Sequence, residues 1–173
     1  MSTIINRAAA PFPMITWSEL SEDNQYLATL AARLVSSLRR WTGKNLANPT
    51  LSATEQAREL FEAPFVLISH DSAKDPLLNY ANRTALNLFE LDWNELIILP
   101  SRCTAQPMHQ EERARLLATV TRDGFIDDYR GVRITKSGRR FLIEQATVWN
   151  LVDERDVYCG QAATFSRWRY LDE

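Results

Sequence analysis

The chain has 173 residues, 45% of them hydrophobic, which is enough for one domain of ordinary size with a buried core and an appendage. Its 20 basic and 22 acidic side chains nearly cancel at a formal net charge of −2, so no global field attracts nucleic acid or an anionic membrane. Two cysteines outside any CxxC pair exclude a disulfide scaffold, and no apolar run approaches the roughly 20 residues that span a bilayer. We therefore expect a cytoplasmic protein without a secretory signal or a transmembrane segment.

Residues 1–50 are predicted to form an N-terminal segment with one long amphipathic helix. Thr16 and Glu19 make a capping box at its start, and Gly43 stands where a C-terminal cap is expected. Apolar residues recur between them at three- and four-residue steps, which is typical of a helix with one apolar face. This interaction helix presents Leu27, Leu30, Leu34, Leu38 and Trp41. Either the domain's own surface covers that stripe, or the same helix of a second subunit does, as in a homodimer.

Residues 51–173 are predicted to form the globular domain. Ser52 and Glu55 make a second capping box, which begins a short helix that ends near Glu62. The apolar run 65–69 then has the length and composition of a buried strand.

Short helices follow a second predicted strand at 77–80. Asn82 is expected to cap the first of these helices. Asp92 and Glu95 make a third capping box, for a helix that Pro100 ends. A further helix is predicted from about residue 110 to residue 122, with Gly124 behind it.

Three β-rich runs complete the chain at 129–134, 140–151 and 157–165. Short polar turns separate them, so an antiparallel meander is expected. The order of strands, short helices and strands predicts an α+β domain with one mainly antiparallel sheet.

Several short sequence motifs resemble those of a known family. The stretch 78–86 resembles the strand-to-helix passage of PAS domains. The words that resemble the MEKHLA family are Trp93–Leu96, Leu99–Arg102, Glu111–Leu117, Tyr129–Ile134 and Ala146–Leu151. The resemblance implies a PAS-like five-stranded antiparallel sheet with short helices packed on it and a regulatory or sensing role. It is closest to the stand-alone bacterial form, found in cyanobacteria especially, and implies no settled ligand.

PAS-like sheets and helices can enclose a pocket for flavin, haem or a small metabolite. By analogy with PAS domains, and by strand alternation, the hypothetical ligand-binding residues are Phe65, Leu67, Tyr80, Leu88, Val132, Ile143 and Ala163. A register error of one residue would reverse the predicted face of a strand. No cofactor is assigned from the sequence.

Single reactive residues give weak signals. Cys103 follows Arg102, the reverse of the order in the Asn-Cys-Arg-Phe word of flavin-binding LOV domains, so we expect a structural cysteine. His70 and His109 stand where turn or cap roles are expected and suit neither haem nor zinc. The consecutive Ser69, His70 and Asp71 cannot face one another in a strand. We predict no catalytic residue, no metal site and no enzymatic activity.

An arginine cluster surrounds one predicted hairpin. Its members are Arg130, Arg133, Arg139 and Arg140, with Arg113 and Arg115 on the preceding helix. The favoured interpretation is a solvated sheet face paired with Asp127, Asp128 and Glu144. The alternative is a surface for an acidic partner or an anionic ligand. Although the stretch 167–170 has the chemistry for stacking on bases, no specific nucleic-acid binding is expected.

Two functional hypotheses follow from the sequence. The first is a non-catalytic PAS-like regulatory or sensory module that acts through protein contact, as a homodimer or with a regulatory partner. The second is a receptor whose small-molecule or chromophore ligand lies between the sheet and the helices. The sequence separates the two poorly, because a filled core and a lined cavity have the same apolar pattern.

Overall fold

The computed structural model describes residues 20–171, without the side chains of residues 107 and 108. Its helices are η2 (Glu22–Leu27), α1 (Ala28–Thr42), α2 (Ala53–Glu62), α3 (Arg83–Phe89), α4 (Trp93–Leu96), η3 (Ser101–Thr104) and α5 (Pro107–Asp123). Its strands are β1 (Val66–His70), β2 (Leu78–Ala81), β3 (Phe125–Ile134), β4 (Arg140–Val152), β5 (Tyr158–Phe165) and β6 (Arg167–Tyr170).

All the strands belong to one antiparallel sheet in the order β2-β1-β5-β4-β3, which confirms the predicted α+β fold class. The sheet has one strand more than predicted, because β6 pairs with the first half of β4. The long β4 therefore has β3 on one side and both β5 and β6 on the other. β4 is therefore paired with β3, β5 and β6.

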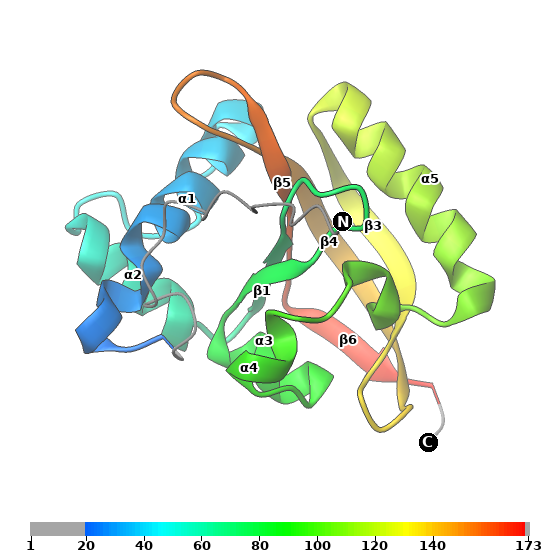
Figure 1. The fold of residues 1–173 in the computed structure, drawn as a ribbon. Coiled ribbons are helices and arrows are strands. Elements are labelled where there is room, and N and C mark those ends of the chain that lie inside the picture. Colours follow the sequence, from blue (N-terminus) through cyan, green and yellow to red (C-terminus); the bar gives the residue numbers. More distant parts are fainter. Residues whose placement is uncertain (1–19, 172–173) are drawn as a thin grey trace, which may run out of the picture.

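Helices cover both faces of the sheet. Figure 1 shows α1 and α2 on one side of the strands and α5 on the other. Helix α1 packs on α2 and β4, and α5 packs on β3 and β4. The two layers of helices thus pack on opposite faces of β4.

Two helix starts form through the capping boxes that the local sequence predicts. In α2 the Glu55 amide donates to Ser52 Oγ at 3.3 Å, and the Ser52 amide donates to a Glu55 carboxylate oxygen at 2.8 Å. The reciprocal pair of Asp92 and Glu95 begins α4 in the same way, at 2.8 and 2.9 Å. Both predicted capping boxes are therefore confirmed. Each one satisfies N–H groups at the helix start that have no partner within the helix, and it involves residues only three positions apart.

Several predicted boundaries were wrong. The N-terminal helix begins only at Ala28, because Gln25, Tyr26 and Leu27 have φ values of 51 to 54° and interrupt regular helix. The predicted capping residues Thr16 and Glu19 lie outside the described residues. Helix α4 ends at Leu96, before Pro100, and α5 begins at residue 107, because a proline is accommodated in a first helical turn.

The apolar stripe of α1 is covered within the chain. Leu34 and Leu38 are 0% and 4% exposed, while Leu27, Leu30 and Trp41 are half-buried. Trp41 Nε1 donates to the Asn150 carbonyl on β4 at 3.0 Å. Of the two coverings that the sequence left open, the domain's own surface is the one observed. The division of the chain at residue 50 stays a prediction.

Asn82 links three elements at the start of α3. Its Oδ1 accepts hydrogen bonds from the amides of Leu67 and Ala85, and its Nδ2 donates to the carbonyls of Leu60 and Phe65. The side chain is fully buried, and all four distances lie between 2.7 and 3.1 Å. The predicted cap is therefore confirmed, and it also joins the end of α2 to β1.

Asn82→Asp tests this junction. The carboxylate keeps the accepting oxygen, but it removes both donors and buries a charge, so we expect a loss of about 3 to 5 kcal/mol in the free energy of unfolding. Asn87→Asp, on the exposed face of the same helix, should change it by about 0.5 kcal/mol or less. Urea denaturation followed by circular dichroism measures both, and equal losses would contradict the proposed junction.

Two glycines with similar positive φ values test the docking of α1. Gly124 has φ +98°, and a Cβ there would lie 2.5 Å from the Trp41 ring; Gly138 has φ +92° and open space around it. Gly138→Ala carries only the backbone cost of about 1 kcal/mol. Gly124→Ala should cost roughly 1 to 3 kcal/mol more, because the ring must move. Equal midpoints of thermal unfolding for the two variants would show that Trp41 does not pack there.

Candidate ligand site

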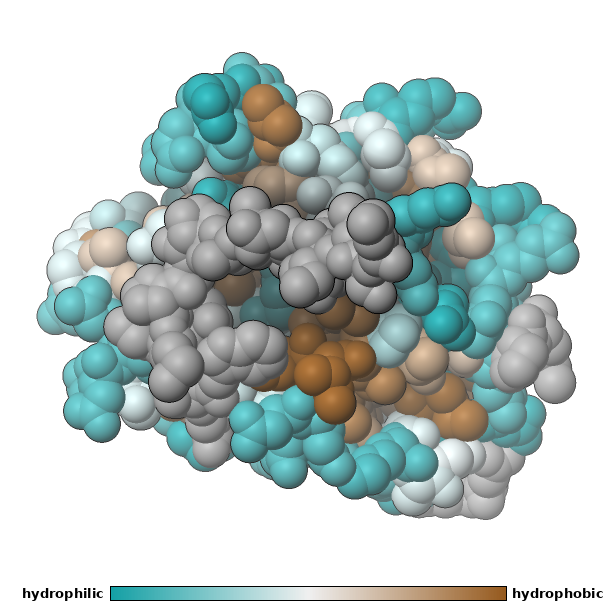
Figure 2. Space-filling view, viewed as in Figure 1, coloured by the Kyte–Doolittle hydropathy of each residue, from teal (hydrophilic) through white to brown (hydrophobic). Residues whose placement is uncertain are grey.

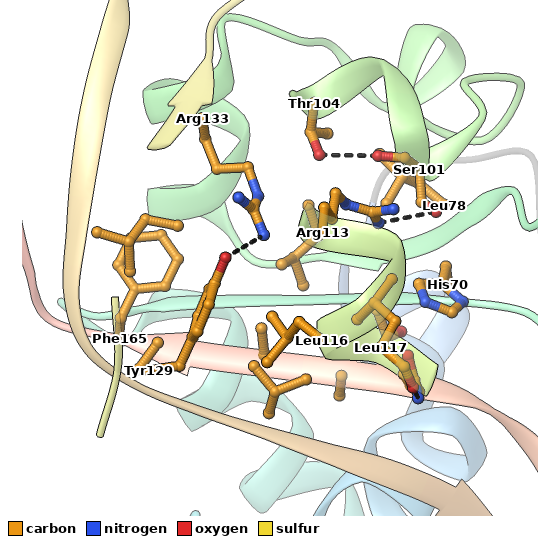
Figure 3. A pocket seen from close by; sticks show the side chains of 18 of the residues that line it. His70, Leu78, Ser101, Thr104, Arg113, Leu116, Leu117, Tyr129, Arg133 and Phe165 are labelled. Atoms are coloured by element: carbon orange, nitrogen blue, oxygen red, sulfur yellow. Dashed lines mark hydrogen bonds between the residues drawn. The ribbon is translucent and has the colours of Figure 1, made fainter. Parts of the chain in front are cut away.

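A cavity of about 70 Å³ lies between the inner face of the sheet and the helices η3 and α5. Its apolar lining comes mainly from the sheet and from α5 and includes Ile68, Leu116, Ile143, Val148, Ala163 and Phe165. Its polar lining is made of Ser69, His70, Ser101, Thr104, Arg113, Tyr129, Arg133 and Gln161. Figure 3 shows the labelled polar side chains around this space, with Arg113 reaching toward Ser101 and Arg133 toward Tyr129.

The observed lining overlaps the predicted one in Ile143 and Ala163. Leu67, Tyr80 and Leu88 are buried in the core, and Phe65 and Val132 are half-buried, all outside the lining. Ile68 and Arg133 line the cavity where their neighbours Leu67 and Val132 were predicted to do so, which is a displacement of one residue on a strand. Whether any of the predicted residues binds a ligand stays a prediction.

His70, at the end of β1, presents an unsatisfied nitrogen. Its side chain is 6% exposed, and Nδ1 lies 2.7 Å from the Asp71 carbonyl. A carbonyl only accepts, so Nδ1 carries the proton and Nε2 of the neutral ring is an acceptor. Nε2 is buried without a hydrogen-bond partner among the described residues.

Burial lowers the pKa of His70 below its ordinary value of 6.5, and the positive charge of Arg113 acts in the same direction. The hydrogen bond to the Asp71 carbonyl, the Asp71 carboxylate and the neighbouring Gln161 side chain oppose the shift. Burial has the largest effect, so the ring is neutral at pH 7.

Two arginines line the same cavity. Arg133 on β3 is 9% exposed, and it donates to its neighbour's carbonyl, at Val132, at 2.8 Å and to the Tyr129 hydroxyl at 3.2 Å. Arg113 on α5 is half-buried and donates to Ser101 Oγ at 3.0 Å. Burial and the charge of Arg133 lower the pKa of Arg113 to about 10, so Arg113 is a cation at pH 7.

Neither of these arginines has an acidic partner within the described part of the chain. Arg115 pairs with Glu111 and Arg169 with Glu144, while Asp127 pairs with Lys44. The expectation of a wholly solvated arginine face was therefore wrong for Arg133, because the strand turns it inward beside Tyr129. Sequence reasoning missed Arg133 as a lining residue, although its spacing of four from Tyr129 was a usable signal.

A network of amides closes the other end of the cavity. Gln161 Nε2 donates to the Leu117 carbonyl, to Thr121 Oγ1 and to Asn150 Oδ1 at 2.8 to 3.1 Å. Asn150 Nδ2 donates to the carbonyls of Val120 and Thr121. The network therefore satisfies carbonyl groups near the C-terminal end of α5 and ties that end to β4 and β5.

The cysteines and the consecutive Ser69, His70 and Asp71 form no reactive site in the cavity. Cys103 is exposed and Cys159 is half-buried, and neither lines the cavity. Ser69 Oγ donates to Asn79 Oδ1 at 2.7 Å, whereas His70 bonds to the backbone, so no triad is assembled. Within residues 20–171, no cluster of three His, Cys, Asp or Glu side chains could hold a metal ion. No helix of that part of the chain is long and apolar enough to cross a membrane.

The outer surface around the site is mainly hydrophilic. Figure 2 shows hydrophilic residues along the rim of this face and hydrophobic ones near its middle. The large hydrophobic residues that are exposed within the described chain are Ile98, Val157 and Tyr158. Ile98 lies in the connection between α4 and η3, and Val157 and Tyr158 lie at the hairpin between β4 and β5.

Solved structures with similar folds are PAS and light-oxygen-voltage domains. The PAS domain of a protein from Colwellia psychrerythraea has a TM-score of 0.57 and 14% identity, over 68% of this chain and 94% of that one. A light-oxygen-voltage domain studied with a flavin analogue has a TM-score of 0.54 and 16% identity, over 69% and 86%. An RNA-binding light-oxygen-voltage receptor has a TM-score of 0.55 and 15% identity, over 70% and 34%. At these identities the likeness establishes a PAS fold.

The family is defined by sequence. The model of the MEKHLA domain matches residues 28–170, which include α1 and every strand. The chain belongs to the MEKHLA domain family, as the sequence words predicted. No curated protein sequence matches it.

The lowered pKa of His70 predicts a pH dependence of stability. As the pH drops from 7.5 toward the lowered pKa, His70 becomes protonated in the unfolded chain while it stays neutral in the folded chain. The free energy of unfolding therefore falls over this range. One such group contributes at most about 1.4 kcal/mol per pH unit. His70→Gln should remove this contribution and His109→Gln should retain it. Identical pH curves for the wild type and His70→Gln, in urea denaturation, would contradict it.

Proposed function

We propose that this chain is a non-catalytic regulatory module that receives a small-molecule signal in the cavity and transmits it by contact with another protein. The observation that carries the proposal is the buried acceptor of His70, which lacks a partner and lines a cavity between the sheet and α5. Of the buried polar side-chain atoms without a partner among the described residues, those of Tyr80, Gln106 and Trp149 lie outside the cavity lining, and only that of His70 belongs to a residue that lines it. A light-oxygen-voltage domain with a similar fold was studied with a flavin analogue, which supports a ligand-binding role for this fold.

The absence of enzymatic activity is part of the proposal. Acid–base or nucleophilic catalysis requires a base within hydrogen-bond reach of a second reactive group. The described polar groups of the cavity are two cations, hydroxyls, an amide and one neutral imidazole, and no carboxylate or thiol is among them. This set can bind and orient a ligand, and it offers no nucleophile activated by a neighbouring base.

A large chromophore fits this cavity poorly. Ligand pockets for molecules of drug size have volumes of about 300 to 1,000 Å³, several times the 70 Å³ observed. The exposed Cys103 is not placed to react with a ring in the cavity. We therefore propose a small metabolite rather than a flavin or another chromophore.

Helix α1 is the proposed output element. Asn150 touches both layers of helices, because its side chain donates to α5 carbonyls and its own carbonyl accepts from Trp41 of α1. If α5 moves toward or away from a ligand, Asn150 moves with it, and the position of α1 on β4 changes. A homodimer through Leu27, Leu30 and Trp41 would use the half-buried part of the stripe, since Leu34 and Leu38 are already covered.

Native mass spectrometry of the full chain purified from its own host, with an absorption spectrum, tests the proposal. We expect a bound small mass without visible colour, and slower amide exchange in residues 28–42 of the bound form than of the free form. No bound mass under varied growth conditions, or the same exchange in both forms, would contradict the receptor role. Light scattering reports the oligomeric state, and a monomer at high micromolar concentration would exclude the homodimer and leave a different protein as the partner.

A further inference from the structure

The cavity carries a strong charge imbalance. Arg113 and Arg133 both line it, and no carboxylate side chain of the described residues lines it or pairs with either arginine. A buried cation without an anionic partner is costly, and two cations that face one space repel each other. The neighbouring hydroxyl groups accept hydrogen bonds from the guanidinium groups but bring no negative charge.

We propose that the cavity binds a short carboxylic acid, with its carboxylate between Arg113 and Arg133 and its apolar body against the sheet. This inference rests on the proposed function in taking the cavity as the ligand site, and it names the class of ligand. The planar guanidinium group matches a carboxylate by paired hydrogen bonds.

The remaining lining selects a carboxylate over inorganic phosphate. Leu116, Ile143, Val148 and Phe165 supply no donors, so the further oxygen atoms of a phosphate would lose their hydration without compensation. The same side chains suit an alkyl group. A cavity of 70 Å³ is about half of one that admits benzene, which limits the acid to a few carbon atoms.

His70 adds selectivity for a hydroxy acid. Its unpartnered Nε2 is an acceptor in the same cavity, and a neutral alkyl chain cannot satisfy it. A hydroxyl group on the ligand donates to this nitrogen. Lactate therefore binds more tightly than propionate, the same three-carbon acid without the hydroxyl.

Isothermal titration of the full chain with sodium propionate, at an ionic strength held constant with sodium chloride, tests the anion site. Propionamide is the uncharged probe of the same shape, and it should bind at least about tenfold more weakly. Arg113→Gln and Arg133→Gln should each weaken propionate binding by at least about tenfold. Arg115→Gln is the matched control, since Arg115 lies on the same helix, 69% exposed and paired with Glu111, and it should change the affinity less than about twofold.

Thermal unfolding separates a binding role from a structural one. Arg113→Gln removes a like charge from the cavity, so without propionate its Tm should equal or exceed that of the wild type, while the rise in Tm with propionate disappears. His70→Phe should abolish the preference for lactate over propionate and retain propionate binding. A lowered Tm of Arg113→Gln that persists without propionate, together with unchanged propionate affinity, would assign Arg113 a structural role and overturn the proposal.

The remaining outcomes are equally distinct. Equal affinities for propionate and propionamide, or saturable binding of phosphate instead of propionate, would overturn the carboxylate assignment. If propionate and lactate fail to bind while native mass spectrometry finds a neutral compound, the carboxylate inference fails and the proposed receptor role stands. If neither experiment finds a ligand, both fail.

Discussion

The buried carboxamide of Asn82 is the interaction on which the arrangement of the domain depends. A carboxamide offers two donors and an oxygen that accepts twice, and here all four hydrogen bonds are made to backbone groups of separate elements. Because one of these groups is the Leu67 amide, the asparagine sets the position of β1 relative to α2 and α3. β1 in turn carries Ile68 and His70 to the cavity, so the ligand site inherits its geometry from this one side chain.

The interior contains two polar groupings of opposite character. Asn150 and Gln161 make a network in which every amide donor has a partner, and it binds the C-terminal end of α5 to the sheet. Arg113 and Arg133, away from this network, are cationic, and His70, which pairs with Gln161 across β1 and β5, has an Nε2 without a partner among the described residues. A satisfied network rigidifies its surroundings, so the C-terminal end of α5 is fixed to the sheet, and under the proposed function the part of α5 that carries Arg113 is the part that a ligand contacts.

Local chemistry explains which parts of this structure could be predicted from the sequence. Capping boxes act within four residues, so the starts of α2 and α4 and the cap of α3 follow from the residues alone. The lining of the cavity depends on the face of each strand, and a displacement of one residue exchanges Leu67 for Ile68 and Val132 for Arg133. The packing of the apolar face of α1 on β4 and the pairing of β6 with β4 are contacts between residues far apart in the sequence. Local sequence patterns therefore could not predict them.

The placement of α1 has a consequence for how this domain can signal. Helix α1 covers the outer face of β4 and α5 covers the inner face, so under the proposed function β4 lies between the ligand site and the output helix. A ligand shifts the position of α1 only by as much as its affinities for the two arrangements differ, however tightly it binds. The hydrogen bonds of Asn150 to both helices are the contacts that can differ, because they are directional and their loss is costly in a buried site. Coupling between the cavity and the outer surface therefore depends on the geometry of this one residue more than on the bulk packing of the core.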